Sequence, residues 1–198
     1  MTVLGTPPGE ALYGTVPLLL LRHGQTPGNA LGRYLGRTDE PLSPQGRAAV
    51  LALNPPKVGR VYVSPLLRCR QSAALLYPGQ PALPVEGLRE CEFGRFENKS
   101  FRELADDPDY QRWVESGGTL PFPGGESRED FVRRTLAAFE GLDLRGGAAI
   151  VAHGGTVMAL MSALLGGDYF DYQTPCATGF LCRWNGDKLS CPQPFGRA

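Results

Sequence analysis

The chain has 198 residues, of which 42% are hydrophobic and 20% charged, and its 20 lysines and arginines balance its 20 aspartates and glutamates. This length and composition predict one globular domain over residues 15–198, behind a flexible tail at 1–14. The even charge balance argues against nucleic acid or a membrane surface as a partner. No segment reaches the roughly 18 apolar residues that a membrane span needs.

In the first half of the chain, apolar runs alternate with signals for helix starts. Two Ser-Pro pairs each place a capping serine before a proline at the first helical position. The expected elements are a strand over 16–21, a loop over 29–41, a helix from Ser43-Pro44 to about residue 53, a strand over 58–63, a helix from Ser64-Pro65 to about 77–79, and a short strand over 83–85.

In the second half, Ser100 and Glu103 have the spacing of a capping box, and we expect the helix that they open to be interrupted at Pro108. Strands that alternate with helices predict an α/β fold, with a three-layer, doubly wound, mostly parallel sheet and helices on both faces. The remaining expected elements are a turn over 121–125, a helix from Ser127 to about 139, a strand over 148–152, a helix over 155–165, and a closing hairpin over 178–184 and 188–190.

The cysteines are odd in number and form no CxxC pair, which favours free thiols in a reducing cytoplasm over a disulfide framework. Their spacing does not suit a zinc site. The N-terminal residues also lack the basic and apolar regions of a signal peptide, so we expect a cytoplasmic protein. The five cysteines are Cys69, Cys91, Cys176, Cys182 and Cys191.

The chain has only two histidines, and each ends an apolar run and precedes a glycine. His23 follows four leucines and Arg22, whereas His153 follows Ala-Ala-Ile-Val-Ala. Runs of this kind are typical of buried strands, and ligands of open α/β sheets bind at the carboxyl ends of such strands. The two imidazoles are therefore predicted to share one site.

The residues around these histidines suit a phosphate group. Arg22 offers a fork of donors beside a possible nucleophile. Arg68 would lie near a helix start, where the helix dipole already favours anions, so a bound anion would explain a cation there. The helix that begins near Gly154 would point backbone N–H groups at the same anion. Neutral donors for it are available at Gln25, Thr26 and Asn29.

Three glutamates lie close together in one loop, at Glu90, Glu92 and Glu97. One of them, kept protonated by burial near an anion, could pass a proton to a leaving alkoxide. The spacing does not choose among the three. Several aromatic residues are candidates for pocket walls, although core packing accounts for them equally well: Tyr13, Tyr34, Phe122, Phe170 and Tyr172.

Taken together, these segments resemble the histidine phosphatase superfamily, which also contains the cofactor-dependent phosphoglycerate mutases. The resemblance covers most of the chain, from about Leu18 to Thr156, and its segments are in the family's order. They are Leu-Arg-His-Gly-Gln-Thr-x-x-Asn at 21–29, Asp-Glu-Pro-Leu-Ser-x-x-Gly at 39–46, Ser-Pro-Leu-x-Arg at 64–68, Leu-x-Glu-x-x-Phe-Gly-x-x-Glu at 88–97, Pro-Gly-Gly-Glu-Ser at 123–127, and Val-Ala-His-Gly-Gly at 151–155.

The resemblance implies a phosphoglycerate mutase-like fold and a role for each matching residue. His23 matches the nucleophile that becomes a phosphohistidine, and Glu90 matches the proton donor of the phosphatase-type members. No metal and no bound organic cofactor is expected, and the expected partner is a small phosphomonoester substrate. The residues that match the clamp on the phosphate oxygens are Arg22, Arg68 and His153, with Asn29 as a secondary contact.

The sequence favours a phosphatase for small phosphomonoesters, and its specific substrate could be alpha-ribazole phosphate. Three alternatives to a phosphatase remain. A mutase shares the Arg-His-Gly core, but mutases carry an added segment and a longer chain. A catalytically silent phosphate-binding domain is disfavoured because both histidines, both arginines and Glu90 are present. A two-histidine phosphoesterase for RNA ends would need His-x-Thr or His-x-Ser twice, and the chain lacks this pattern.

Overall fold

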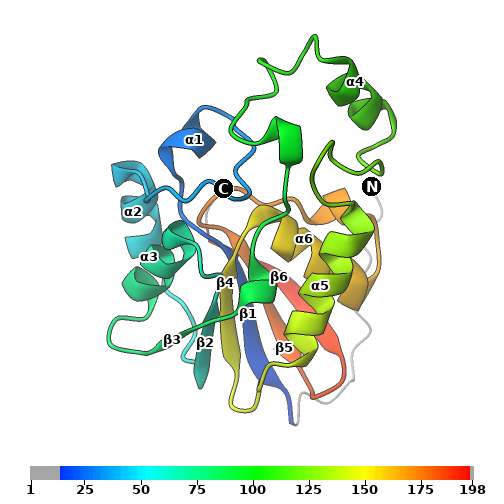
Figure 1. Cartoon of the computed structure of the whole chain (residues 1–198). Coiled ribbons are helices and arrows are strands. Elements are labelled where there is room, and N and C mark those ends of the chain that lie inside the picture. The colour runs from blue at the N-terminus through cyan, green and yellow to red at the C-terminus, as the bar shows by residue number, and fades with distance from the viewer. Residues whose placement is uncertain (1–13, 197–198) are drawn as a thin grey trace, which may run out of the picture.

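In the part of the chain that the structure describes, six strands form one mixed sheet in the order β3-β2-β4-β1-β5-β6 (Figure 1). The four strands from β3 to β1 run parallel, and β5 and β6 form an antiparallel hairpin at the other edge. The sheet is thus mostly parallel, as predicted. The strands are β1 (Val16–Arg22), β2 (Arg60–Val63), β3 (Ala82–Pro84), β4 (Ala148–Ala152), β5 (Gly179–Trp184) and β6 (Leu189–Phe195).

The computed structural model describes residues 14–196, so the tail predicted at 1–14 lies outside the described residues except for Gly14. The α-helices are α1 (Pro27–Ala30), α2 (Pro44–Leu51), α3 (Leu67–Leu76), α4 (Pro108–Glu115), α5 (Arg128–Glu140) and α6 (Gly154–Leu165). Three short 3₁₀ helices complete the described part of the chain: η1 (Glu86–Leu88), η2 (Gly94–Phe96) and η3 (Tyr169–Tyr172).

The alternation of side chains along β1 explains why helices cover both faces. Leu18 and Leu20 pack with residues of α5 and α6, whereas Leu19 and Leu21 pack with residues of α2 and α3. All four leucines are completely buried, and burying each one stabilises the fold by about 1.5–3 kcal/mol. The predicted three layers are confirmed: α2 and α3 cover one face of the sheet, and α5 and α6 cover the other (Figure 1).

Two predicted helix starts are wrong. Helix α3 begins at Leu67 rather than after Ser64, because the Ser64 hydroxyl lies 2.7 Å from Nε2 of His153 and does not cap a helix. Ser100 and Glu103 do form the reciprocal bonds of a capping box, but residues 101–106 make only turns. Pro108 starts α4 instead of interrupting a helix, because the Asp107 side chain caps the N–H groups of Asp109 and Tyr110.

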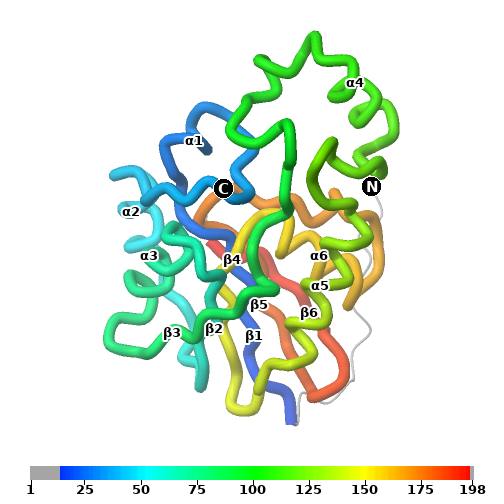
Figure 2. The backbone as a smooth tube through the Cα atoms, viewed as in Figure 1, coloured from blue at the N-terminus to red at the C-terminus, as the bar shows by residue number. Residues whose placement is uncertain are grey.

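The carboxyl ends of β1, β2 and β4 meet at one end of the sheet, where α1 and the segment that carries α4 lie beyond the strands (Figure 1). Figure 2 shows how the chain between β3 and α5, drawn in green, leaves the layers and arches over this end. Within the expected loop over 29–41, the helix α1 extends only to Ala30. Loops from distant parts of the sequence therefore enclose the end of the sheet where the two histidines lie.

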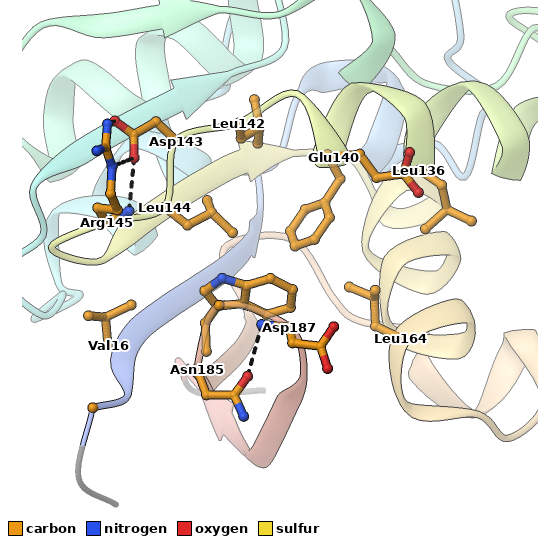
Figure 3. Close-up of a pocket in the computed structure, with 14 residues that line it drawn as sticks. Val16, Leu136, Glu140, Leu142, Asp143, Leu144, Arg145, Leu164, Asn185 and Asp187 are labelled. Carbon is orange, nitrogen blue, oxygen red and sulfur yellow. Dashed lines mark hydrogen bonds and ion pairs between the residues drawn. The ribbon is translucent and has the colours of Figure 1, made fainter.

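A cavity of about 620 Å³ lies at the end of the sheet opposite the histidines, where β1 begins and β5 ends (Figure 3). Val16, Leu136 and Leu164 contribute to its apolar wall, and Asp143 forms an ion pair with Arg145 at its margin. Among the described residues, its lining includes carboxylates but no histidine, cysteine, serine or threonine. Within the described residues, no helix is both long and apolar enough to cross a bilayer.

Candidate active site

His23 follows directly on β1, and its hydrogen-bond partners fix its tautomer. Its Nδ1 lies 2.6 Å from the Gly24 carbonyl oxygen, and its Nε2 lies 3.2 Å from Nε of Arg68. A carbonyl only accepts and a guanidinium only donates, so Nδ1 carries the proton and Nε2 keeps its lone pair. Burial, together with the charges of Arg68 and Arg22, holds the pKa of His23 well below its ordinary value. His23 is therefore a neutral imidazole whose Nε2 carries no proton and accepts a hydrogen bond from Arg68.

Arg68 lies in the first turn of α3 and is completely buried. Besides His23, its guanidinium donates to three backbone carbonyls of one loop: Thr38 at 2.7 Å, Leu35 at 2.8 Å and Gly36 at 3.3 Å. No carboxylate of the described chain forms an ion pair with it. Its positive charge is therefore held rigidly beside His23 and is not neutralised there.

Arg22 brings a second guanidinium to the same place. Its Nη1 donates to the Thr174 carbonyl at 2.7 Å, while its Nε is buried and has no hydrogen-bond partner in the described chain. A buried donor without a partner costs free energy, which a bound anion would recover. Arg22, Asn29 and Gly154 all line the cavity that contains His23.

Gln25 and Thr26 take part in the loop after β1 instead of lining that cavity. The Gln25 side-chain oxygen accepts from the Ser43 hydroxyl at 3.3 Å. Thr26 is the N-cap of α1, and its hydroxyl donates to the Asn29 side-chain oxygen at 3.0 Å. In this structure, both side chains shape the loop that presents Asn29.

His153 follows β4, the strand next to β1, and lies edge-on to His23 with 5.2 Å between the ring centroids. It is completely buried, and its Nε2 lies 2.7 Å from the Ser64 hydroxyl. Burial, Arg68 and His23 hold the pKa of His153 well below its ordinary value. The two imidazoles are thus brought together, as the two strand ends in the sequence indicated.

Glu90 lies against the start of α6. Its Oε2 accepts from the Gly155 N–H at 3.2 Å, and its Oε1 accepts from the Cys91 N–H at 3.0 Å. A Cβ on Gly155 would lie 2.3 Å from Oε1 of Glu90, so only glycine allows this approach. Burial raises the pKa of Glu90, although the two N–H donors act in the opposite direction.

The structure distinguishes Glu90 from the other two glutamates of the loop. Glu92 pairs with the exposed Arg37 at 2.5 Å. The Glu97 carboxylate accepts from Gly36 N at 3.0 Å, from Thr38 N at 2.8 Å and from the Thr38 hydroxyl at 2.7 Å. Glu97 therefore braces the loop whose carbonyls hold Arg68, and of the three only Glu90 lines the cavity.

An ion pair that the sequence did not reveal holds the backbone around Glu90. Arg134 of α5 donates to the carbonyls of Gly87 at 3.0 Å, Arg89 at 2.9 Å and Glu90 at 3.0 Å. The same guanidinium binds both oxygens of Glu126, at 2.7 and 2.8 Å. No local pattern marks this arrangement, because the three carbonyls lie 44 to 47 residues before Arg134 in the chain.

The site opens into a cavity of about 360 Å³, which is within the range of small-molecule sites. Three of the candidate aromatic residues, Tyr34, Phe122 and Phe170, line it, whereas Tyr172 does not and Tyr13 lies outside the described residues. The complete set of aromatic lining residues is Tyr34, Phe93, Phe101, Trp113, Phe122, Phe131, Tyr169 and Phe170.

The donor groups suited to a metal ion are not clustered. Among the described residues, no three His, Cys, Asp or Glu side chains are placed to hold one together. All five cysteines are free thiols, as their number and spacing predicted.

Comparison with known proteins shows the family of this chain. The family model of the histidine phosphatase superfamily (branch 1) matches residues 18–183. The glucosyl-3-phosphoglycerate phosphatase of Mycolicibacterium vanbaalenii is 36% identical over 169 residues, which cover 75% of this chain and 74% of that protein. The adenosylcobalamin/alpha-ribazole phosphatase of Salmonella typhimurium is 30% identical over 159 residues, covering 75% and 79%.

Among solved structures, the phosphoglycerate mutase of Thermus thermophilus superposes with a TM-score of 0.71 at 31% sequence identity. The superposition covers 92% of this chain and 100% of that one. The fold is therefore phosphoglycerate mutase-like, as the sequence resemblance implied. From the match over most of its length, this chain belongs to the histidine phosphatase superfamily.

Proposed function

We propose that this protein is a phosphomonoesterase that acts on a small phosphorylated metabolite through a phosphohistidine on His23. Phosphoryl transfer needs mainly positioning and neutralisation of charge, because its transition state spreads charge over three oxygens. Arg22 and Arg68 supply two guanidiniums for this purpose, and the ring of His153 lies beside that of His23. The single observation that carries the proposal is the lone pair on Nε2 of His23, beside the Arg68 guanidinium.

In the first step, Nε2 of His23 attacks phosphorus, so the P–N bond forms while the P–O ester bond breaks. The leaving alkoxide takes a proton from the Glu90 carboxyl group. The raised pKa of Glu90 supports this role, because it extends the pH range over which the carboxyl group keeps its proton. The Gly24 carbonyl holds the Nδ1 proton of His23 and stabilises the positive charge that the ring acquires.

In the second step, water attacks the phosphohistidine, and the P–N bond breaks with its electron pair returning to Nε2. Glu90, now a carboxylate, accepts the proton of the attacking water and is ready for the next cycle. Inorganic phosphate then leaves with the two arginines still in place. We assign this enzyme to the cytoplasm, because its free thiols suit a reducing compartment.

The experiment that tests the proposal is a phosphate-release assay with a panel of phosphorylated metabolites, with and without EDTA. We expect phosphate release that EDTA does not diminish and that His23→Ala abolishes. A His23→Ala protein that releases phosphate at near the original rate contradicts the proposal.

A phosphoglycerate mutase is the second candidate, because a solved structure of that name covers almost the whole chain at 31% identity. The two activities differ in their products. A mutase interconverts 2- and 3-phosphoglycerate, whereas the proposed enzyme releases inorganic phosphate. Isomer interconversion without phosphate release would favour the mutase.

A further inference from the structure

Beyond the catalytic residues, the wall of the active-site cavity is aromatic. The eight aromatic lining residues come from widely separated segments, from Tyr34 after β1 to Tyr169 and Phe170 in η3. Arg22, His23 and Glu90 line the same cavity, so a phosphate held at Arg22 and His23 leaves the rest of the substrate in contact with the rings.

Several hydrogen-bonding groups of this wall are already engaged, although the side-chain amide of Gln173 and the indole N–H of Trp113, which also line the cavity, have no hydrogen-bond partner in the described chain. The Tyr34 hydroxyl lies 3.0 Å from the Tyr110 hydroxyl, and the Tyr169 hydroxyl donates to the Gly155 carbonyl at 3.3 Å. Arg33 donates to the Asn98 carbonyl and pairs with Glu103. A leaving group rich in hydroxyls would give up its bonds to water here and regain few of them, which is costly.

Two of the rings at this wall are not explained by core packing. Phe101 is 53% exposed and Phe170 is 42% exposed, although both line the cavity. The Arg128 guanidinium lies 4.9 Å from the centre of the Phe170 ring and 5.0 Å from that of Tyr169. The wall therefore combines aromatic rings with a planar cation, the two kinds of group on which an aromatic ring can stack.

We propose that the alcohol released from the substrate carries an aromatic ring, which binds between the catalytic residues and the rings of Phe101 and Phe170. This inference rests on the proposed phosphatase function, since it concerns the leaving group of that reaction. The phosphate group fixes one end of the substrate at His23, and ring stacking fixes the other.

The test compares primary alkyl phosphates whose alcohols leave with similar ease. We expect kcat/KM for 2-phenylethyl phosphate to be about 10- to 100-fold higher than kcat/KM for ethyl phosphate. It should also be about 2- to 10-fold higher than kcat/KM for 2-cyclohexylethyl phosphate. Glycerol 1-phosphate should be no better than ethyl phosphate. Equal values for the phenyl and ethyl compounds, or for the phenyl and cyclohexyl compounds, overturn the ring site.

The variants Phe101→Ala and Phe170→Ala test whether these two rings cause the preference for the phenyl substrate. Both positions are exposed enough to tolerate the change. Each should lower the ratio of the phenyl to the ethyl value by about 5-fold or more. Leu51→Ala is the control, because Leu51 is 61% exposed on α2 and does not line the cavity, and it should leave the ratio unchanged. An unchanged ratio in both Phe variants overturns the inference.

The two proposals fail in different ways. Phosphate release from every substrate at similar rates overturns the ring site and leaves the phosphatase intact. No release from any of these substrates, nor from 4-nitrophenyl phosphate, contradicts the phosphatase itself.

Discussion

Arg68 donates from Nε to the lone pair of His23 Nε2 over 3.2 Å, and both side chains are buried. The same guanidinium is fixed by three carbonyls of the 35–38 loop, so its position does not depend on a bound ligand. Charge fixed in advance near a reacting atom needs no reorganisation during the reaction, and such preorganisation is a large part of catalysis.

Replacing Arg68 with alanine should lower kcat by about 10²- to 10³-fold, the loss typical of one transition-state donor. Arg22→Ala should cost a similar factor. Arg70→Ala is the matched control, because Arg70 lies two residues further along the same helix but is exposed. The kcat of this variant should not change. Steady-state kinetics of phosphate release measures all three, and a normal rate in Arg68→Ala would refute the role of this side chain.

The rate should depend on pH through His23 and Glu90. The pKa of His23 is lowered, so the nucleophile stays neutral to well below pH 6.5 and the acid limb should lie there. The pKa of Glu90 is raised, so the alkaline limb should lie above 4.5, where the carboxyl group loses its proton. In Glu90→Gln, the rate should fall by about 10²- to 10⁴-fold and the alkaline limb should vanish. An alkaline limb that persists in this variant assigns it to another group.

Arg134 is predicted to position Glu90, since it binds the carbonyls on both sides of that residue's peptide. Arg134→Ala should therefore slow hydrolysis of alkyl phosphates by about 10-fold or more, yet have little effect on 4-nitrophenyl phosphate, whose leaving group needs no proton. Arg133→Ala is the control, because Arg133 is exposed and pairs only with Asp130. A loss that is equal for both substrates would mean a purely structural role.

Glu97 is predicted to act through the 35–38 loop. In Glu97→Gln, the amide keeps one acceptor oxygen but turns an N–H₂ group toward hydrogen-bond donors. The free energy of unfolding should therefore fall by about 1–3 kcal/mol. Each kcal/mol lost should lower Tm by about 2–4 °C. Because the loop holds Arg68, binding of inorganic phosphate should weaken as well. Glu129→Gln, at an exposed carboxylate on α5, is the control. If Glu97→Gln is destabilised but binds inorganic phosphate as tightly as the original protein, the 35–38 loop does not control phosphate binding.

The sequence predicted the sheet and the two histidine positions because strand ends followed by His-Gly are local patterns. It also placed Arg68 near a helix start, although the start lies at Leu67 rather than beside Ser64. The clamp of Arg134 with Glu126 could not be predicted, since it depends on tertiary contacts with residues 87–90. Likewise, the engagement of Gln25 and Thr26 within their own loop follows from backbone geometry that composition does not encode.

The most direct test of the central claim is to trap the phosphoenzyme. After a rapid alkaline quench during turnover, mass spectrometry of the peptide that contains His23 should show an added phosphoryl group, which mild acid removes. His23→Ala should show none at any position, whereas Glu90→Gln should still form it from 4-nitrophenyl phosphate. Steady turnover without phosphate on His23, or with phosphate on His153 instead, would contradict the account.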